Sequence, residues 1–476
     1  MTWLTAYFTV YSIVGWIIRA GMLPTVLRRQ FTPGAALAWL GIVSLHPYIG
    51  LSLYLLVGEN RLGRGREARH RELVARYRHP DATPTPPSPI GAERDEAWKP
   101  VATQAMKVGQ LPVLGANAVD FLIDSTAMTD RLVADINGAR STVHLLYYIF
   151  SPDATGQRVV AALIAAAGRG VACRVLADAY ASGGIFRRNG LAAHLRQHNI
   201  QVAQALPRAL NRRRDLRNHR KLAVIDGVIA FAGSQNLIDA DYGGRCGGPW
   251  HDLTGRMTGP IVSELSALFA EDWAFETEEL LEVVAFSDRP ADARGIEMQA
   301  VPTGPVKASE SYRRVLLAAI QCATRRLILT TPYFVPDDPT LVALMMAADR
   351  GVDVTLIVPR TPDQFFTAWA ARSHFAKLMD SGVSIFLYRP GLIHSKTATV
   401  DDTVALFGSA NLDVRSFNLN FELSILAYGP EVTDRLRDIQ MAYVQDSTRL
   451  DLKRWSSRSV LRRYGEAAVS LVSPLL

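Results

Sequence analysis

One motif occurs twice in this sequence and constrains the fold more than any other feature. Each copy reads His-x-Lys, four residues, Asp, six residues, Gly-Ser-x-Asn. The copies comprise His219, Lys221, Asp226 and Gly233–Asn236, and then His394, Lys396, Asp401 and Gly408–Asn411. Every matched position is separated by 175 residues, as from His219 to His394. Two full copies in one register predict an internal duplication, with two lobes that bring the two motifs together.

Each copy has the pattern of a β-hairpin. In the first, the apolar runs Leu222–Ile225 and Val228–Phe231 flank Asp226-Gly227, a pair typical of tight turns. Residues two apart on a strand point to the same face, so each histidine shares a face with the lysine of its motif. The asparagine that ends each motif follows the return strand and comes back beside the histidine.

The side chains on this face suit an anion. Lysine, asparagine and serine are hydrogen-bond donors, and a phosphate is the simplest oxyacid that they would bind. Histidine can act as nucleophile, base or acid. A metal is disfavoured because a lysine beside each histidine would repel a cation, so we expect neither metal nor cofactor. The catalytic candidates are His219, Lys221, Asp226, His394, Lys396 and Asp401, and the substrate-binding candidates are Ser234, Asn236, Ser409 and Asn411.

The two Asp residues of the motif leave a choice open. Asp226 and Asp401 stand at the hairpin turns, where capping the turn is as good an interpretation as a chemical role. Two other carboxylates occupy equivalent places, because Asp252 and Glu422 each precede a Gly-Pro pair by seven residues. There a carboxylate could hydrogen-bond a histidine ring and fix its tautomer. A surface acid is the alternative.

The rest of each half alternates strand-like and helix-like runs, which favours an α/β fold. The runs of the first half include Val143–Tyr148, Val159–Ala167 and Cys173–Leu176. The second half repeats them from Leu327 through Val354–Ile357. We therefore predict two pseudo-symmetric α/β lobes packed together, at residues 98–290 and 291–476.

The first 58 residues predict a membrane region of two helices. Met1–Ile18 carries no charged side chain, and Gly34–Gly58 has only His46 besides tyrosine as a titratable group. A span needs about 20 apolar residues, so the second stretch fits a transmembrane helix, while the first spans or lies obliquely. A signal peptide is disfavoured, because no basic start or clear cleavage site is present.

Positive charge follows this region. Residues 59–97 predict a basic and Pro-rich linker, and its first part holds Arg61, Arg64, Arg66, Arg69 and Arg71. Fewer arginines lie between the helices, namely Arg19, Arg28 and Arg29. The positive-inside tendency therefore places the catalytic part in the cytoplasm.

The charge of the whole chain favours anionic partners. The formal net charge is +7, from 52 basic and 45 acidic residues, which suits nucleic acid or acidic lipid. A basic run precedes the first motif and reads as a solvated loop or a headgroup-binding one: Arg208, Arg212–Arg214, Arg217 and Arg220. Near the C-terminus Lys453, Arg454, Arg458, Arg462 and Arg463 flank Trp455, Val460, Leu461 and Tyr464, as in an interfacial amphipathic segment.

The double motif resembles that of the phospholipase D superfamily, and the sequence around it is similar to that of the bacterial cardiolipin synthases. The resembling pieces are Tyr147–Phe150, Asn218–Lys221, Pro249–Asp252, Tyr333–Asp337, Asp413–Ser416 and Asn420–Glu422. The resemblance implies a multi-pass protein of the bacterial inner membrane that uses phosphatidylglycerol and anionic lipids, with no nucleic acid as partner. It also implies that Asp252 and Glu422 support the histidines and favours His219 as nucleophile, with His394 as general acid. Arg415 and Ser416 would add donors, although a solvated arginine is an equal alternative.

The resulting hypothesis is conversion of two phosphatidylglycerols to cardiolipin and glycerol through a phosphohistidine, with a bell-shaped dependence on pH. Two alternatives remain open. One is a hydrolytic phospholipase or nuclease with the same active-site residues. The N-terminal helices favour a lipid-transfer enzyme over this alternative. The other is a non-catalytic lipid-binding scaffold, which intact histidines in both copies disfavour. Neither the acceptor alcohol nor the oligomeric state follows from the sequence.

Overall fold

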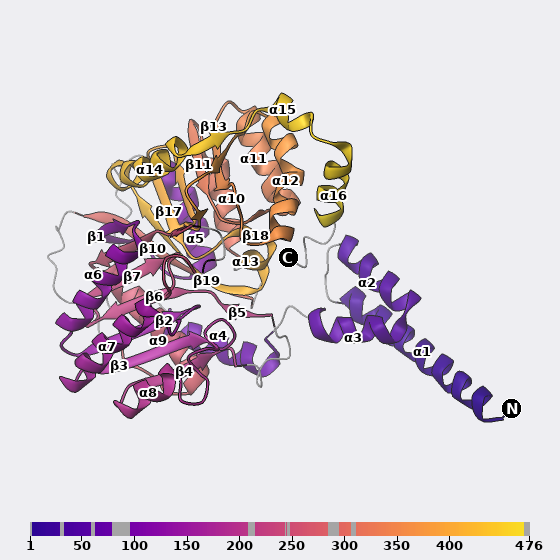
Figure 1. Ribbon diagram of the computed structural model, residues 1–476, viewed down its shortest axis with the longest axis horizontal. Coiled ribbons are helices and arrows are strands. Elements are labelled where there is room, and N and C mark those ends of the chain that lie inside the picture. Colours follow the sequence, from indigo (N-terminus) through magenta and orange to yellow (C-terminus); the bar gives the residue numbers. More distant parts are fainter. Residues whose placement is uncertain are drawn as a thin grey trace. The chain divides into compact units, whose positions relative to one another are not determined.

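The computed structural model describes residues 2–28, 33–58, 62–78, 96–207, 215–242, 244, 248–283, 295–305 and 311–470 (Figure 1). The chain divides into two compact units. The smaller comprises Met1–Arg64 with Arg208–Leu216, and the larger comprises Gly65–Pro207 with Arg217–Leu476. Each unit is described by itself.

The smaller unit is helical and differs from the two-span prediction. Its helices are α1 (Thr2–Arg28), α2 (Pro33–Leu45) and α3 (Pro47–Val57). Among the described residues, one helix is long and apolar enough to cross a membrane, over Trp3–Arg28. The stretch predicted to be the better span is instead broken at His46, before Pro47. Proline lacks an N–H donor and disfavours helical geometry in the residue before it, which explains the break.

The two short helices pack closely as a pair. At 1.5 Å per residue, α2 and α3 are about 20 and 17 Å long, short of the roughly 30 Å that a hydrocarbon core requires. A Cβ added to Gly50 of α3 would lie 2.7 Å from the Cα of Val43 on α2, so glycine permits this approach. Val43 and Tyr54 are buried with Met22 and Val26 of α1. The prediction of a single helix over residues 34–58 is therefore wrong.

Part of the expected linker is a helix that belongs to the larger unit. Helix α4 (Arg64–Tyr77) packs against α9 (Ile261–Thr277). Arg78 donates from Nε and Nη2 to the two carboxylate oxygens of Glu271 at 2.6 Å, and both side chains are buried. The Tyr77 hydroxyl donates to the Leu281 carbonyl at 3.0 Å. The Pro-rich part of the linker, residues 79–95, lies outside the described residues.

These contacts also neutralise part of the arginine cluster on which the orientation argument depends. Arg66 pairs with Glu276 at 2.8 Å and Arg69 pairs with Glu278 at 2.6 Å. Arg61 lies outside the described residues. The positive-inside tendency counts lysines and arginines rather than net charge, so these pairs leave the count unchanged, and the orientation stays a prediction.

The α4 contacts predict two different results of truncation. Removal of residues 1–58 should leave a larger unit that folds in detergent-free buffer, because its core contains none of those residues. Removal of residues 1–95 would leave Glu271 buried without Arg78 and should cost about 3–5 kcal/mol of folding free energy. Urea unfolding of both truncated proteins would measure this difference in folding free energy. The matched control is Arg78→Met in the protein that lacks only residues 1–58. Equal stability of both truncations would show that α4 is dispensable.

The larger unit is built on one continuous sheet whose two halves repeat each other. Among the described residues, the strands of the first half run from the centre outward as β1 (Leu114–Leu122), β9 (Thr254–Thr258), β7 (Ile229–Gly233), β6 (Lys221–Ile225), β2 (Thr142–Tyr147), β3 (Ala172–Asp178) and β4 (Gln201–Ala205). Those of the second run as β10 (Ile296–Thr303), β19 (Asn420–Tyr428), β17 (Val404–Gly408), β16 (Thr397–Val400), β11 (Arg326–Thr330), β13 (Asp353–Pro359), β14 (Ser384–Tyr388) and β20 (Ser447–Arg449). The halves join where β1 pairs with β10 in antiparallel register. The predicted pair of pseudo-symmetric α/β lobes is confirmed.

Helices cover both faces of this sheet. The outer helices are α6 (Ser125–Gly138), α7 (Ala154–Gly168), α8 (Leu191–Gln197), α5 (Lys99–Gly109), α10 (Tyr312–Cys322), α11 (Asp338–Asp349) and α12 (Phe365–Asp380). Helices α9 and α14 (Pro430–Gln445) share the opposite face, and both begin beside a Gly-Pro pair. Strand β6 shows the alternation: Leu222 and Val224 pack with α9, and Ala223 and Ile225 pack with the outer helices.

Candidate active site

Both motifs form the predicted hairpins. Strand β6 pairs with β7 from Leu222↔Ala232 to Ile225↔Ile229. Strand β16 pairs with β17 from Thr397↔Phe407 to Val400↔Val404. The turn residues Asp226 and Asp401 have φ values of 53° and 49°, which an aspartate tolerates better than most residues. Each hairpin therefore places its histidine and lysine at the end opposite the turn.

Short parallel strands then join each histidine to the other lobe. Strand β5 (Arg217–Asn218) pairs with the start of β19, and the His219 amide donates to the Phe421 carbonyl at 2.9 Å. Strand β15 (Leu392–Ile393) pairs with β8 (Trp250–His251), and the His394 amide donates to the His251 carbonyl at 2.8 Å. Each histidine thus lies beside the segment that carries the supporting carboxylate of the opposite lobe.

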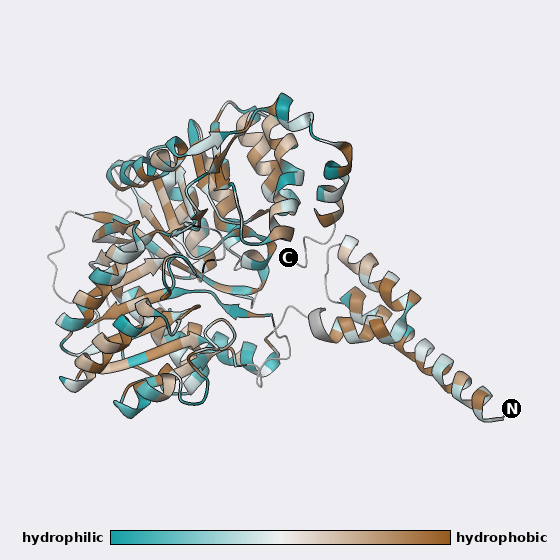
Figure 2. Ribbon diagram, in the orientation of Figure 1, coloured by the Kyte–Doolittle hydropathy of each residue, from teal (hydrophilic) through white to brown (hydrophobic). Residues whose placement is uncertain are grey.

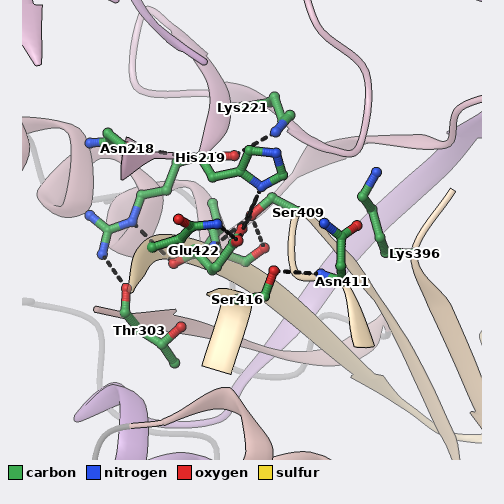
Figure 3. Close-up of polar contacts among 12 residues, drawn as sticks. Asn218, His219, Lys221, Thr303, Lys396, Ser409, Asn411, Ser416 and Glu422 are labelled. Carbon is green, nitrogen blue, oxygen red and sulfur yellow. Dashed lines mark hydrogen bonds and ion pairs between the residues drawn. The ribbon is translucent and has the colours of Figure 1, made fainter. Parts of the chain in front are cut away.

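The histidine–carboxylate pairs are exchanged between the lobes. His219 Nδ1 lies 3.0 and 3.1 Å from the two oxygens of Glu422 (Figure 3). His394 Nδ1 lies 2.6 Å from Oδ1 of Asp252. A proton on Nδ1 is held by the carboxylate, so Nε2 keeps the lone pair that can attack or accept a proton. The sequence predicted the carboxylates but not that each serves the histidine of the other lobe.

The motif serines hold these carboxylates. Ser234 Oγ donates to Asp252 Oδ1 at 2.6 Å, and Ser409 Oγ donates to Glu422 Oε2 at 2.5 Å. Both hydroxyls also accept a backbone N–H at 2.9 Å, and both serines are buried. Their expected role in substrate binding is corrected: their hydroxyls are engaged in orienting the acids that orient the histidines.

The two asparagines differ in their availability. Asn236 accepts the Ile149 amide at 3.0 Å and donates to the Tyr242 hydroxyl at 3.2 Å, which in turn donates to Asp252 at 3.1 Å. The side chain of Asn411 is buried and its Oδ1 has no hydrogen-bond partner among the described residues. Its backbone N–H donates to Ser416 Oγ at 3.1 Å. Asn411 is therefore the better candidate for contact with a ligand.

The two lysines show that both motifs share one site. Lys221 and Lys396 are buried, and each Nζ donates to the carbonyl of the histidine in its own motif, at 2.6 and 2.5 Å. Burial lowers the pKa of both lysines, that of Lys396 to about 7, although Glu422 and Asp252 oppose the effect. The charge of Lys396 contributes to lowering the pKa of Lys221, which places the two ammonium groups in one electrostatic environment.

The same environment keeps both histidines neutral. Burial is the main cause that lowers the pKa of His219 to about 4 and that of His394 to about 3, and the lysines add to it. The carboxylate partners oppose this shift. For Glu422 and Asp252, burial would raise the pKa, but the neighbouring histidine and lysines hold both pKa values below the usual range. An anionic ligand between the lysines would favour the protonated form of one histidine.

Asp226 and Asp401 do not belong to this site. Asp226 accepts the backbone N–H groups of Arg140, Ser141 and Thr142 at 2.7 to 2.9 Å. Asp401 accepts those of residues 324–326 at 2.7 to 3.0 Å. Burial alone would raise their pKa values, but these donors hold them below the usual range. Their predicted catalytic role is corrected to a structural one: each joins its hairpin turn to the start of the neighbouring strand, β2 or β11.

A substitution should separate the structural role from a chemical one. Asp226→Asn or Asp401→Asn removes the charge and puts an amide donor opposite N–H donors, so we expect a loss of about 1–3 kcal/mol of folding free energy. Urea unfolding would measure it. Because the turn lies about 17 Å along the strand from the lysine, turnover by the folded fraction should change less than about threefold. An inactive variant of unchanged stability would restore the catalytic interpretation.

Several residues around the histidines were missed as site residues. The Tyr148 ring lies 4.7 Å from the His219 ring, edge on, and burial raises its pKa to about 12. Trp250 lies 4.8 Å from His394 and stacks on Tyr242 at 3.8 Å. Tyr148 and Trp250 fall within the pieces that resemble the family, which was the available signal. Tyr242 comes from the glycine-rich loop region and had none.

The arginines have unequal roles. Arg220 is fully buried and pairs with Asp272 at 2.6 Å, so its assignment to a solvated basic run is wrong. The charges of Arg217 and Arg415 act on Tyr148, where they oppose the effect of burial on its pKa. Arg415, on α13 (Val414–Asn418), is half-buried, and its role as a donor stays a prediction. The rest of the basic run, residues 208–214, lies outside the described residues.

Comparison with known proteins follows the same division into two halves. A family model described as "Cardiolipin synthase, PLD-like domain" matches residues 132–245 and 316–441, each of which holds one motif. The chain is 34% identical over 497 residues to cardiolipin synthase A of Klebsiella pneumoniae (strain 342), covering 99% of this chain and 100% of that protein. It is 33% identical over 491 residues to cardiolipin synthase A of Yersinia pseudotuberculosis serotype O:1b (strain IP 31758), with the same coverage.

A solved structure shares the fold. The phosphatidylserine synthase of Haemophilus influenzae Rd KW20 matches with a TM-score of 0.60 at 16% identity. The match covers 79% of this chain and 100% of that one. At this identity the likeness concerns the fold alone.

Proposed function

Because this chain belongs to the cardiolipin synthase family of the phospholipase D superfamily, we propose that it joins two phosphatidylglycerols into cardiolipin and releases glycerol. The chain is an enzyme of phosphatidyl transfer. The observation that carries the proposal is the pair of buried histidines in one site, each held by a carboxylate of the opposite lobe. Two such groups meet the need of a double displacement for one nucleophile and one proton carrier.

In the first half of the reaction, Nε2 of His219 attacks the phosphorus of one phosphatidylglycerol. The P–O bond to the headgroup glycerol breaks as the P–N bond forms. His394, protonated in the bound state, gives its proton to the departing glycerol oxygen. Lys221 and Lys396 stabilise the charge on the phosphoryl oxygens, and we expect further donors from the amide N–H groups of Asn411 and the guanidinium of Arg415.

In the second half, the neutral His394 accepts the proton of a glycerol hydroxyl on a second phosphatidylglycerol. The oxygen attacks phosphorus and the P–N bond breaks, which yields cardiolipin and restores both histidines. Tyr148 and Trp250 enclose the rings in apolar surfaces, so water competes poorly with the lipid alcohol.

We place the enzyme in the bacterial inner membrane, with its larger unit on the cytoplasmic side. The apolar helix α1 and the α2–α3 pair support membrane attachment. The sidedness depends on the arginines that follow α3, of which Arg66 and Arg69 are paired with glutamates. Phosphatidylglycerol and other anionic lipids are the proposed partners.

Incubation of the purified full-length protein with phosphatidylglycerol as the only lipid would test the proposed function. Mass spectrometry should show cardiolipin and glycerol in equal amounts, and EDTA should leave the rate unchanged. The His219→Ala variant is the control for contaminating activity. Phosphatidic acid as the dominant product would make the protein a hydrolase. Cleavage of DNA without lipid turnover would make it a nuclease.

The lowered histidine pKa values predict an unusual acid limb in the pH profile of kcat/KM. Protonation of Nε2 removes the attacking lone pair, so activity fails below the pKa of the free nucleophile. Burial moves that pKa from its ordinary value to about 4. We therefore expect the acid limb, where His219 becomes protonated, to lie near pH 4 rather than near the unperturbed value of about 6.5, while the basic limb is set by loss of the proton that His394 needs as general acid. Rates measured alongside circular dichroism would separate this limb from acid unfolding; a limb near 6.5 would show that the histidines are solvated.

A further inference from the structure

An exposed apolar patch lies on two outer helices of the larger unit. Phe365 and Phe366 at the start of α12 are 58% and 56% exposed. Val460, Leu461 and Tyr464 on α16 (Val460–Ser470) are 61%, 83% and 72% exposed. We call these five residues the α12–α16 patch. In Figure 2, α16 carries strongly hydrophobic and strongly hydrophilic residues along one short helix.

The two parts of the patch flank one helix–helix contact. A Cβ added to Gly465 would lie 2.6 Å from the ring of Trp369, so α16 packs tightly on α12 at this point. The Phe365 ring lies 4.7 Å from the Trp369 ring, one helical turn before it. Leu461 likewise lies one turn before Gly465. All five residues are thus within about one helical turn of a single contact between α12 and α16.

Basic side chains border this patch. Residues 452–470 hold five basic residues and one acidic residue, Glu466, which pairs with Arg458 at 2.8 Å and Arg462 at 3.5 Å. Beside them, around α15 (Leu452–Ser456), a cavity of about 530 Å³ has one acid, Asp451, and four arginines in its lining: Arg360, Arg449, Arg454 and Arg458. Arg454 and Lys453 are exposed. Apolar side chains bordered by cations are typical of a surface that rests at the headgroup level of an anionic bilayer.

The patch begins next to the active site. The Tyr333 hydroxyl donates to Asp363 at 2.9 Å, and Asp363 lies two residues before Phe365. Phe334, the residue after Tyr333, pairs with Leu412, the residue after Asn411 of the second motif. A bilayer that covers the α12–α16 patch would therefore lie near the place where a lipid phosphate must enter.

We propose that the α12–α16 patch docks the larger unit onto an anionic phospholipid bilayer, with lipid phosphates at the four arginines. This docking rests on the proposed function for its lipid substrate, but it requires no turnover and none of residues 1–58. It would hold the active-site entrance at the bilayer surface, so that phosphatidylglycerol reaches the histidines without leaving the lipid phase entirely.

Photolabelling of the full-length protein in liposomes would test this docking. The liposomes contain phosphatidylglycerol and a phosphatidylcholine with a diazirine in its acyl chain. Peptides over residues 365–366 and 460–464 should be labelled, and Phe365→Ser with Phe366→Ser should reduce labelling of 460–464 by about fivefold or more. Labelling of Trp3–Arg28 serves as the internal standard. Met346→Ser with Leu280→Ser is the matched control, because these apolar residues are 55% and 50% exposed outside the patch.

Each outcome decides between the alternatives. The proposal would be overturned if the patch were labelled no more strongly than Val342 and Met346, the exposed apolar residues of α11. Crosslinking of the patch to a second protein chain in place of lipid would also overturn it. Loss of the signal in the control variant would overturn it as well. Because His219→Ala should be labelled like the wild type, normal labelling without any phosphatidyl transfer would reject the proposed function and leave the docking surface standing.

Discussion

Replacement of His219 by alanine is expected to abolish the covalent intermediate and to lower turnover by about 10⁴-fold or more. Replacement of His394 should lower turnover of phosphatidylglycerol by about 10²–10⁴-fold, the usual contribution of a general acid–base. The difference appears with a nitrophenyl phosphodiester, whose leaving group needs no proton. There His394→Ala should still form the adduct on His219, and should accumulate it because the base for the second step is missing.

Intact-mass measurement on both variants after exposure to the activated substrate checks this division of labour. Both histidines are buried, and the assignment of their roles stays a prediction. His219 is 8% exposed and His394 is 4% exposed, and His394 is enclosed by Trp250 and Tyr242. An adduct on the His219 variant with none on the His394 variant would reverse the two roles and leave the rest of the mechanism intact.

The exchange of carboxylates between lobes predicts the second large effect. Glu422→Gln should impair the step that His219 performs, although Glu422 belongs to the second lobe. Asp252→Asn should impair the steps of His394, although it belongs to the first. Each amide keeps the shape but loses the charge that holds Nδ1–H and stabilises an imidazolium. We therefore expect losses of about 10²–10⁴-fold in turnover of phosphatidylglycerol.

Adduct formation distinguishes these two variants as well. Glu422→Gln should slow adduct formation from the nitrophenyl phosphodiester, whereas Asp252→Asn should leave its rate within about threefold and slow its decay. The matched controls are Asp401→Asn and Asp226→Asn, which change the same group in the same lobes away from the site. If Asp252→Asn blocked adduct formation and Glu422→Gln did not, each carboxylate would serve the histidine of its own lobe, contrary to the observed contacts.

The N-terminal region illustrates a limit of composition as a guide. Apolar residues over 34–58 predicted one span, yet a single proline divides them into two short helices. Hydropathy counts side chains, whereas the break follows from the missing N–H of Pro47 and its effect on His46. Composition also does not show which arginines are exposed. Arg78, for example, forms a buried ion pair with Glu271, about 190 residues later in the chain.

The sequence by itself determined the duplication, the hairpins and the candidate reacting groups. These follow from local rules: strand alternation sets which residues share a face, and a fixed spacing between two copies requires two similar lobes. The two supporting acids could also be found, because their distance to a Gly-Pro pair is the same in both halves.

Only the tertiary structure decided how these groups are paired. The pairing of β1 with β10 joins the lobes edge to edge in one sheet, and the strands before each histidine pair across the boundary with the other lobe. That exchange matched His219 with Glu422 and His394 with Asp252. No local pattern encodes such partners. The histidine and carboxylate of one pair are 142 positions apart in the chain and those of the other are 203 positions apart, so their contact depends on how the whole sheet is assembled.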